Sequence, residues 1–213
     1  LVSKFYNLLA DTIINEPEGR RLIIELFYKS YKCDRSRYAY SEILQSLALY
    51  QCGSTIISLL EDWPYEQIQR ASKLWQIAGG NSVVKFWAYF HLATLKQDST
   101  RNYLLKALKK YPWETDLILK ALSVSRDKYW LDYFKSYIRQ ETNKMFVWYA
   151  IYGIYKIKDI ETLRRHEDKI IAIILHLKKN HQKLHHDMKL ILQSIGTERA
   201  LAVVKYIDSD TVR

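Results

Sequence analysis

Residues that break regular structure are scarce in this sequence. Its 213 residues include 6 Gly and 3 Pro, whereas a protein of strands and tight turns needs many residues that adopt turn geometry. The scarcity therefore predicts an all-α fold. Cys33 and Cys52 are the only 2 cysteines and form no C-x-x-C pair. They indicate small buried side chains in a reducing, cytoplasmic environment, with a disulfide between them as the minor alternative.

A long hydrophobic run is also absent. The longest, residues 145–155, lies between Lys144 and Lys156 and reaches about half of the roughly 20 residues that cross a bilayer. Residues 1–14 carry Lys4 and Asp11 and are typical of an amphipathic helix rather than of a secretory signal. The sequence therefore predicts no membrane span.

Common catalytic and nucleotide-binding motifs are missing as well. The chain contains no G-x-S-x-G, G-x-x-x-x-G-K, G-x-G-x-x-G or H-E-x-x-H, so it predicts no catalytic residue and no cofactor. His176, His181, His185, His186 and Asp187 are the candidates for a metal site, because His181 and His185 would share a helix face. A solvated basic surface of histidines and lysines is the favoured alternative, and we expect no metal.

Positive charge is in excess and unevenly distributed. The net charge is +10, but residues 1–70 contain eight Lys/Arg and nine Asp/Glu, whereas residues 71–213 contain 25 basic and 14 acidic residues. A surface of this kind suits an acidic partner. The open alternative is that the lysines keep a hydrophobic, Tyr-rich protein in solution.

Apolar residues recur at helical spacing along most of the chain. Tyr129, Trp130 and Tyr133 begin an i, i+1, i+4, i+5 rhythm that no strand produces. Residues 83–95 and 145–157 are apolar almost all round and predict central helices that are covered on several sides. Gly, Pro and capping residues separate these segments. The predicted helices span residues 3–14, 18–32, 39–52, 55–62, 65–78, 82–97, 100–111, 113–124, 127–141, 143–157, 160–179, 183–195 and 197–207.

The segment 192–213, LQSIGTERALAVVKYIDSDTVR, combines a helix stop, a cap and a restart. Gly196 suits a left-handed helix end, Thr197 suits an N-cap, and Ala200 permits close helix contact. The pattern resembles a HEAT repeat, in which a helix ending in Ile-Gly leads through a capped turn into Ala-Val/Leu-x-x-Leu, an Asp-x-Asp turn and Val-Arg. The resemblance implies a right-handed α-solenoid, with about six antiparallel helix pairs in a chain of this length.

A weaker echo of this motif lies at residues 74–87. Ile77 aligns with Ile195 at a separation of 118 residues, which fits three periods of about 40. Counting helix pairs from the two motifs gives opposite parity, so we expect an extra or merged helix, with 160–179 as the candidate. We predict a single irregular solenoid domain over residues 1–213. In a HEAT repeat, the end of the last motif would begin another helix. We therefore expect the chain to be an excerpt of a longer protein.

Basic residues and one aromatic residue at a helix junction are the candidates for partner binding. Helical repeats can align such cations along a groove that holds an acidic protein segment or a phosphate backbone. The Lys-Tyr-Pro-Trp junction at 110–113 adds an exposed aromatic side chain that could anchor an interface. The predicted partner-binding residues are Lys106, Lys109, Lys110, Trp113, Arg164, Arg165, Lys178, Lys179 and Lys183.

The sequence thus predicts a non-enzymatic interaction or scaffold module that binds an acidic protein segment. Sequence-independent nucleic-acid binding is the first alternative. The second is a HEAT-like DNA glycosylase, a family that this chain resembles in size, basicity and Trp content. The W-D-x-V-D pattern of those enzymes is missing, and its nearest counterpart, Trp-Leu-Asp at 130–132, lacks the second aspartate. Trp130 also fits an apolar stripe, so we predict that it belongs to the core.

Overall fold

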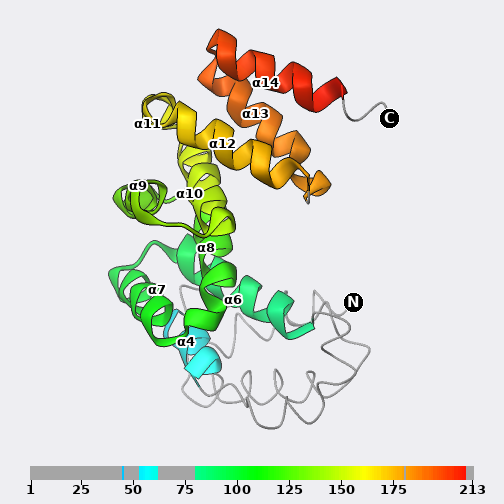
Figure 1. Cartoon of the computed structure of the whole chain (residues 1–213). Coiled ribbons are helices and arrows are strands. Elements are labelled where there is room, and N and C mark those ends of the chain that lie inside the picture. Colours follow the sequence, from blue (N-terminus) through cyan, green and yellow to red (C-terminus); the bar gives the residue numbers. More distant parts are fainter. Residues whose placement is uncertain (1–44, 46–52, 62–79, 180, 210–213) are drawn as a thin grey trace, which may run out of the picture. The chain divides into compact units, whose positions relative to one another are not determined.

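The computed structural model of the chain describes Gln45 and residues 53–61, 80–179 and 181–209 (Figure 1). Every regular element in these residues is a helix, and none is a strand, which confirms the predicted all-α class for this part of the chain. Both cysteines, part of the echo at 74–87, and the helices predicted at 3–14, 18–32, 39–52 and 65–78 lie outside the described residues, wholly or in part.

The chain divides into two compact units, Leu1–Ala121 and Leu122–Arg213. The prediction of one continuous domain stays a prediction. The first unit contains α4 (Gly53–Glu61), α6 (Gly80–Leu95), α7 (Asp98–Lys110), the short 3-10 helix η1 (Pro112–Glu114) and most of α8 (Thr115–Val124). The second contains η2 (Lys128–Trp130), α9 (Leu131–Gln140), α10 (Lys144–Ile157), α11 (Ile160–Arg165), α12 (Glu167–Lys178), η3 (Gln182–Leu184), α13 (His185–Ile195) and α14 (Glu198–Ser209).

In the first unit, α6 packs against α4 and α7, which also contact each other. Ile56, Leu92 and Leu104, one from each helix, are all 0% exposed. The close approach of α4 and α7 depends on Gly53, because a Cβ atom there would lie 2.7 Å from Cγ2 of Thr100. Helices this short are marginal in isolation, so their shared apolar stripes supply most of their stability.

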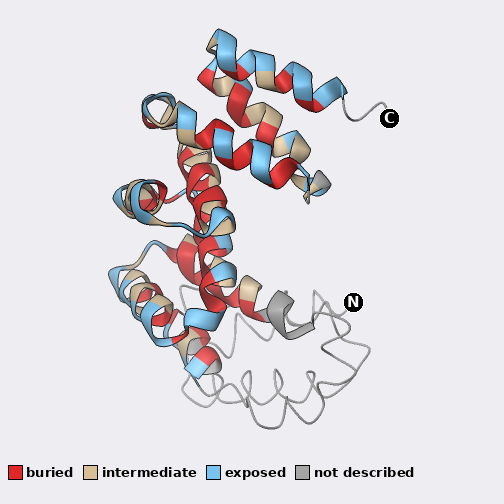
Figure 2. Cartoon of the chain, in the orientation of Figure 1, coloured by how far each residue is buried: buried red, intermediate tan, exposed pale blue. Residues whose placement is uncertain are grey.

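In the second unit, α10 is the central helix. It contacts α9, α11, α12 and α13, and Figure 2 shows buried positions along most of its length. Gly153 lets α9 approach closely, because a Cβ atom there would lie 2.7 Å from Cζ of the buried Phe134 ring. The prediction that residues 145–157 are covered on several sides is confirmed. Beyond α10, the helices α12, α13 and α14 contact one another.

The predicted helix at 160–179 is two helices in the structure. Asp159 caps α11 by accepting a hydrogen bond of 3.2 Å from the backbone N–H of Thr162. His166, with φ −111° and ψ 17°, then interrupts the helical backbone before α12 begins. We expected an extra or merged helix in this segment, and the structure divides it into α11 and α12. The other predicted helices in the described residues are confirmed. Their boundaries differ by two residues or fewer when η1, η2 and η3 are counted with the α-helices that follow them.

The HEAT-like motif near the end of the chain has the local geometry that its residues predict. Gly196 adopts a left-handed φ of +73° at the end of α13. The hydroxyl of Thr197 accepts a hydrogen bond of 3.1 Å from the backbone N–H of Ala200, and Ala200 is 0% exposed between α14 and its neighbours. These features make α13 and α14 a tightly connected helix pair.

Candidate partner-binding surface

The exposed face of α7 carries two lysines that have no acidic partner within the described residues. Lys106 and Lys109 lie about one helical turn apart, and both are exposed. Together with Asn102 and Leu105, they line a shallow hollow of about 240 Å³. Because Leu104 anchors the opposite face of the helix in the core, the amphipathic pattern of α7 holds these lysines toward solvent.

Trp113 projects from η1, immediately after α7. It is 69% exposed, which confirms the prediction of an exposed aromatic residue at this junction. The ring of the buried Tyr111 meets its indole edge to face at a centroid distance of 5.8 Å. Pro112 sits at the first position of η1 and fixes the direction of the chain there. The indole is therefore supported on one side and open to a partner on the other.

Lys110 differs from Lys106 and Lys109 because it is paired within the unit. Its ammonium group donates a hydrogen bond of 2.7 Å to Oε2 of Glu61 in α4. This hydrogen bond raises the pKa of Lys110 and lowers the pKa of the Glu61 carboxyl. Both side chains remain in contact with solvent, so the pair contributes little to stability. Its main effect is to reduce the charge that Lys110 presents to a partner.

Glu114, the residue after Trp113, anchors η1 to the core. It is 4% exposed, and its carboxylate accepts hydrogen bonds from the ammonium group of Lys85, at 2.5 Å, and from the hydroxyl of Tyr89, both in α6. Burial lowers the pKa of Lys85, while the hydrogen bond and charge of Glu114 oppose that shift. A buried carboxylate is tolerated when donors of this kind satisfy it. The cluster thereby holds Trp113 at a defined position.

The cluster around Glu114 was not predicted from the sequence. Nothing in the local pattern distinguishes this glutamate from a solvent-exposed acid at the start of a helix. The available signal was Lys85, a cation inside the nearly all-apolar segment 83–95, because a lysine on the buried face of a helix requires an acidic partner.

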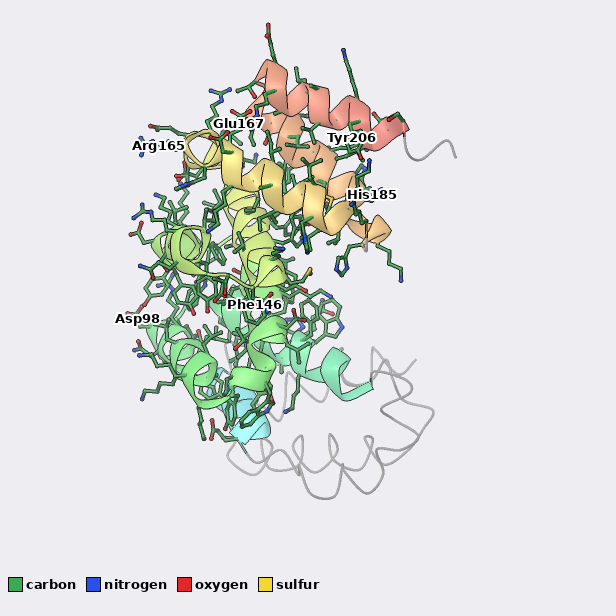
Figure 3. All side chains as sticks on the ribbon, in the orientation of Figure 1. Asp98, Phe146, Arg165, Glu167, His185 and Tyr206 are labelled. Atoms are coloured by element: carbon green, nitrogen blue, oxygen red, sulfur yellow. The ribbon has the colours of Figure 1, made fainter. Side chains whose placement is uncertain are left out.

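The predicted arginines of the second unit are exposed but already engaged. Nε of Arg164 donates a hydrogen bond of 2.9 Å to the backbone carbonyl of Ile195, which ties α11 to the end of α13. The guanidinium group of Arg165, which is labelled in Figure 3, forms an ion pair with Glu161 one turn earlier. Both arginines therefore have local structural roles that account for their positions.

Lys178 corrects the prediction of a continuous solvated basic surface. It is 6% exposed; its ammonium group donates a hydrogen bond of 3.1 Å to the backbone carbonyl of Tyr206 and lies 3.5 Å from the centre of that ring. The long apolar stem of lysine can be buried while its charge meets an oxygen atom and an aromatic face. Lys179 and Lys183 are exposed, as predicted.

Two of the four histidines considered as metal ligands, His176 and His185, have separate partners. Nδ1 of His176 lies 3.1 Å from Nζ of Lys144, and Nε2 of His185 lies 3.0 Å from the backbone carbonyl oxygen of Lys178, to which it can donate. Figure 3 labels His185 on α13 and Tyr206 on α14. In the part of the chain that the structure describes, no group of three or more His, Cys, Asp or Glu side chains is arranged to hold a metal ion.

The Trp-Leu-Asp segment at 130–132 does not form an enclosed site. Trp130 is 0% exposed, which confirms its place in the core. The side chain of Asp132 is 98% exposed, and its carboxylate lies 3.8 Å from the ammonium group of Lys135. A carboxylate this open to water lacks the water-excluding surroundings that are typical of a catalytic acid.

Comparison of the chain with protein-family models, with curated proteins and with solved structures gave no match. A proposal about function therefore rests on the surface chemistry of the two units. Of the helices that the structure describes, none combines the length and the apolar character needed to cross a membrane.

Proposed function

We propose that the chain is a non-enzymatic interaction module that binds an acidic protein segment along α7 and η1. In this proposal, the helix pairs belong to an irregular HEAT-like solenoid that serves as a scaffold. The observation that carries the proposal is the combination of Lys106 and Lys109, which have no acidic partner in the described residues, with the exposed indole of Trp113.

The chemistry of this surface suits an acidic segment that carries one apolar side chain. Two ammonium groups one helical turn apart can each pair with a carboxylate of the partner, and they would raise the association rate by attracting it over a longer range. Trp113 offers a large, rigid apolar area of the kind that dominates interface energetics. The hollow beside Leu105 can receive a small apolar group. Charge would supply the attraction, and the indole would hold the bound segment in one register.

Binding can be measured by fluorescence anisotropy with a labelled peptide of Glu and Asp residues around a single Leu. We expect Lys106→Glu/Lys109→Glu to weaken binding at least tenfold, because two attractive contacts become repulsive. Trp113→Ala should weaken it severalfold at every salt concentration. Lys128→Glu/Lys158→Glu makes the same change in net charge at two exposed positions of the second unit and should have a much smaller effect. Equal losses in the two double variants would reduce the proposal to nonspecific charge attraction.

Single-stranded nucleic acid is the second candidate, and Trp113 is the observation that favours it. Bases stack on exposed aromatic side chains, while nearby lysines contact the phosphates. A labelled oligonucleotide measured at the same ionic strength separates the candidates. Tighter binding of the oligonucleotide than of the acidic peptide, lost in Trp113→Ala and falling steeply with salt, would replace the first proposal with the second.

A further inference from the structure

The outer face of α14 presents charged and apolar side chains that no other described element covers. Leu201 is 41% exposed, and Ala202 beside it is also exposed. Glu198 and Lys205, on the same face, are exposed and have no ion-pair partner within residues 53–61, 80–179 and 181–209. The face therefore has an apolar centre with one free acid and one free base at its ends.

Unlike Glu198 and Lys205, the charged side chains on the flanks of α14 have partners in neighbouring helices. Arg199 pairs with Asp168 of α12, and Asp208 accepts a hydrogen bond of 2.8 Å from Lys189 of α13. The second unit thus uses the flanking charges of α14 to hold the helix in place. Within the described residues, Glu198 and Lys205 on the outer face of the helix are left without such a partner.

The spacing of this face makes it complementary to itself. Glu198 and Lys205 are two helical turns apart, about 10.5 Å along the axis, and Leu201 and Ala202 lie midway between them. A second α14 laid antiparallel about a two-fold axis at this midpoint would place each Glu198 against Lys205 of the other copy. Leu201 would then face Ala202, whose small side chain allows the two helices to approach closely. Such an isologous contact requires one patch that matches itself.

We propose that α14 is the contact surface of a homodimer, formed by antiparallel packing of two copies of this helix. The occupant of the face is a second copy of the chain, because the sign and position of its charges match their own two-fold image. A contact between two helices of 12 residues is smaller than a standard interface of about 1,600 Å². The dimer is therefore weak, and it forms as the protein concentration rises.

Charge reversal tests the pairing directly, with sedimentation velocity of the full 213-residue chain measured from micromolar to millimolar concentration. The wild type should self-associate. Glu198→Lys and Lys205→Glu should each weaken association about tenfold or more, because both symmetry-related pairs become repulsive. An equimolar mixture of these two variants should associate again as a heterodimer, since every pair then has opposite signs. The double variant Glu198→Lys/Lys205→Glu should recover the wild-type behaviour.

Two controls separate this contact from other effects. Circular dichroism and thermal unfolding show whether each variant keeps its fold, and the mixture restores binding only if both chains are folded. Lys106→Glu/Lys109→Glu should leave self-association unchanged, so the outcome is independent of the partner proposed for α7. A wild type that stays monomeric at every concentration would overturn the proposal. So would single variants that associate as tightly as the wild type, or a mixture that fails to associate.

Discussion

Two helix contacts, one in each unit of the chain, are made by different means. In the first, α6 and η1 are joined by a buried carboxylate, that of Glu114, which accepts hydrogen bonds from Lys85 and Tyr89. In the second, the ring of Phe134 in α9 packs against the backbone of Gly153 in α10. A hydrogen-bonded cluster fixes direction as well as distance, whereas an apolar contact depends mainly on filled volume.

The type of contact, polar or apolar, corresponds to the kind of element that the contact holds in place. The cluster at Glu114 holds a short 3-10 helix whose central residue, Trp113, is exposed, so an error in direction would move the proposed interface. The contact at Gly153 holds two regular helices, and their own backbones already set their direction. The comparison predicts that the contact at Glu114 is sensitive to the loss of charge and the contact at Gly153 to a change of volume.

The largest effect is expected from Glu114→Ala. Removing this carboxylate leaves the Lys85 ammonium group buried without its main partner, which costs about 3 kcal/mol or more of unfolding free energy. Lys85→Met/Glu114→Leu replaces the pair with apolar groups and should recover most of that loss. Urea denaturation followed by circular dichroism measures both, and Asp132→Ala, at an exposed acid, is the matched control. If the double variant is no more stable than Glu114→Ala, the buried charge of Lys85 is not the cause of the lost unfolding free energy.

A smaller effect is expected from acid. His91 is 8% exposed, its Nε2 makes no hydrogen bond within the described part, and burial lowers its pKa from 6.5 to about 4. Between these values the unfolded chain binds a proton that the folded chain does not bind, so stability falls as the pH falls from about 6.5 towards 4. The loss should be on the order of 2 kcal/mol, and His91→Leu should remove it.

His166 in the second unit should respond to acid in the same direction. Burial lowers its pKa, and the nearby charges of Arg139 and Lys169 lower it further. The His91→Leu variant should therefore keep a residual acid sensitivity, which His91→Leu/His166→Gln should reduce further. The measurement is the unfolding free energy in urea at several values between pH 4 and pH 7. An acid response in His91→Leu as large as that of the wild type would show that His91 is not its main source.

The smallest effect is expected from Gly153→Ala. The new methyl group would press on the Phe134 ring, and overpacking of this kind costs about 1–3 kcal/mol. The higher helix propensity of alanine offsets about 1 kcal/mol of that cost. Adding Phe134→Leu should make room for the methyl group, so Gly153→Ala should be less costly in that background than in the wild type. Additive losses in the double-mutant cycle would mean that the ring and the glycine are not coupled.

Much of the helical architecture could be predicted from the sequence because local signals mark it. Gly196 and Thr197 end one helix and cap the next through backbone preferences that act within a few residues. Trp130 and Trp113 could also be assigned correctly, one to a buried stripe and the other to an exposed junction. These are properties of neighbouring residues along the chain.

The features that escaped prediction depend on contacts between residues distant in the sequence. Glu114 is buried because Lys85 and Tyr89 reach it from another helix, and Lys178 is buried because α14 provides a carbonyl oxygen and an aromatic ring. The break between α11 and α12 at His166 is not marked by a Gly or Pro in the sequence. The resemblance to HEAT repeats led us to expect an extra or merged helix in this segment, but only the backbone shows where the segment is divided.

Three helices of the chain are followed by a cationic residue with a left-handed backbone. Lys96, Arg126 and Lys158 adopt φ values of 57°, 57° and 67° just after the ends of α6, α8 and α10. Glycine would relieve the strain at such sites, but it would also remove a cation from a helix end whose carbonyl groups attract one. Part of the basic excess thus also has a role within the fold, because it places exposed cations at the negative ends of the chain's own helix dipoles.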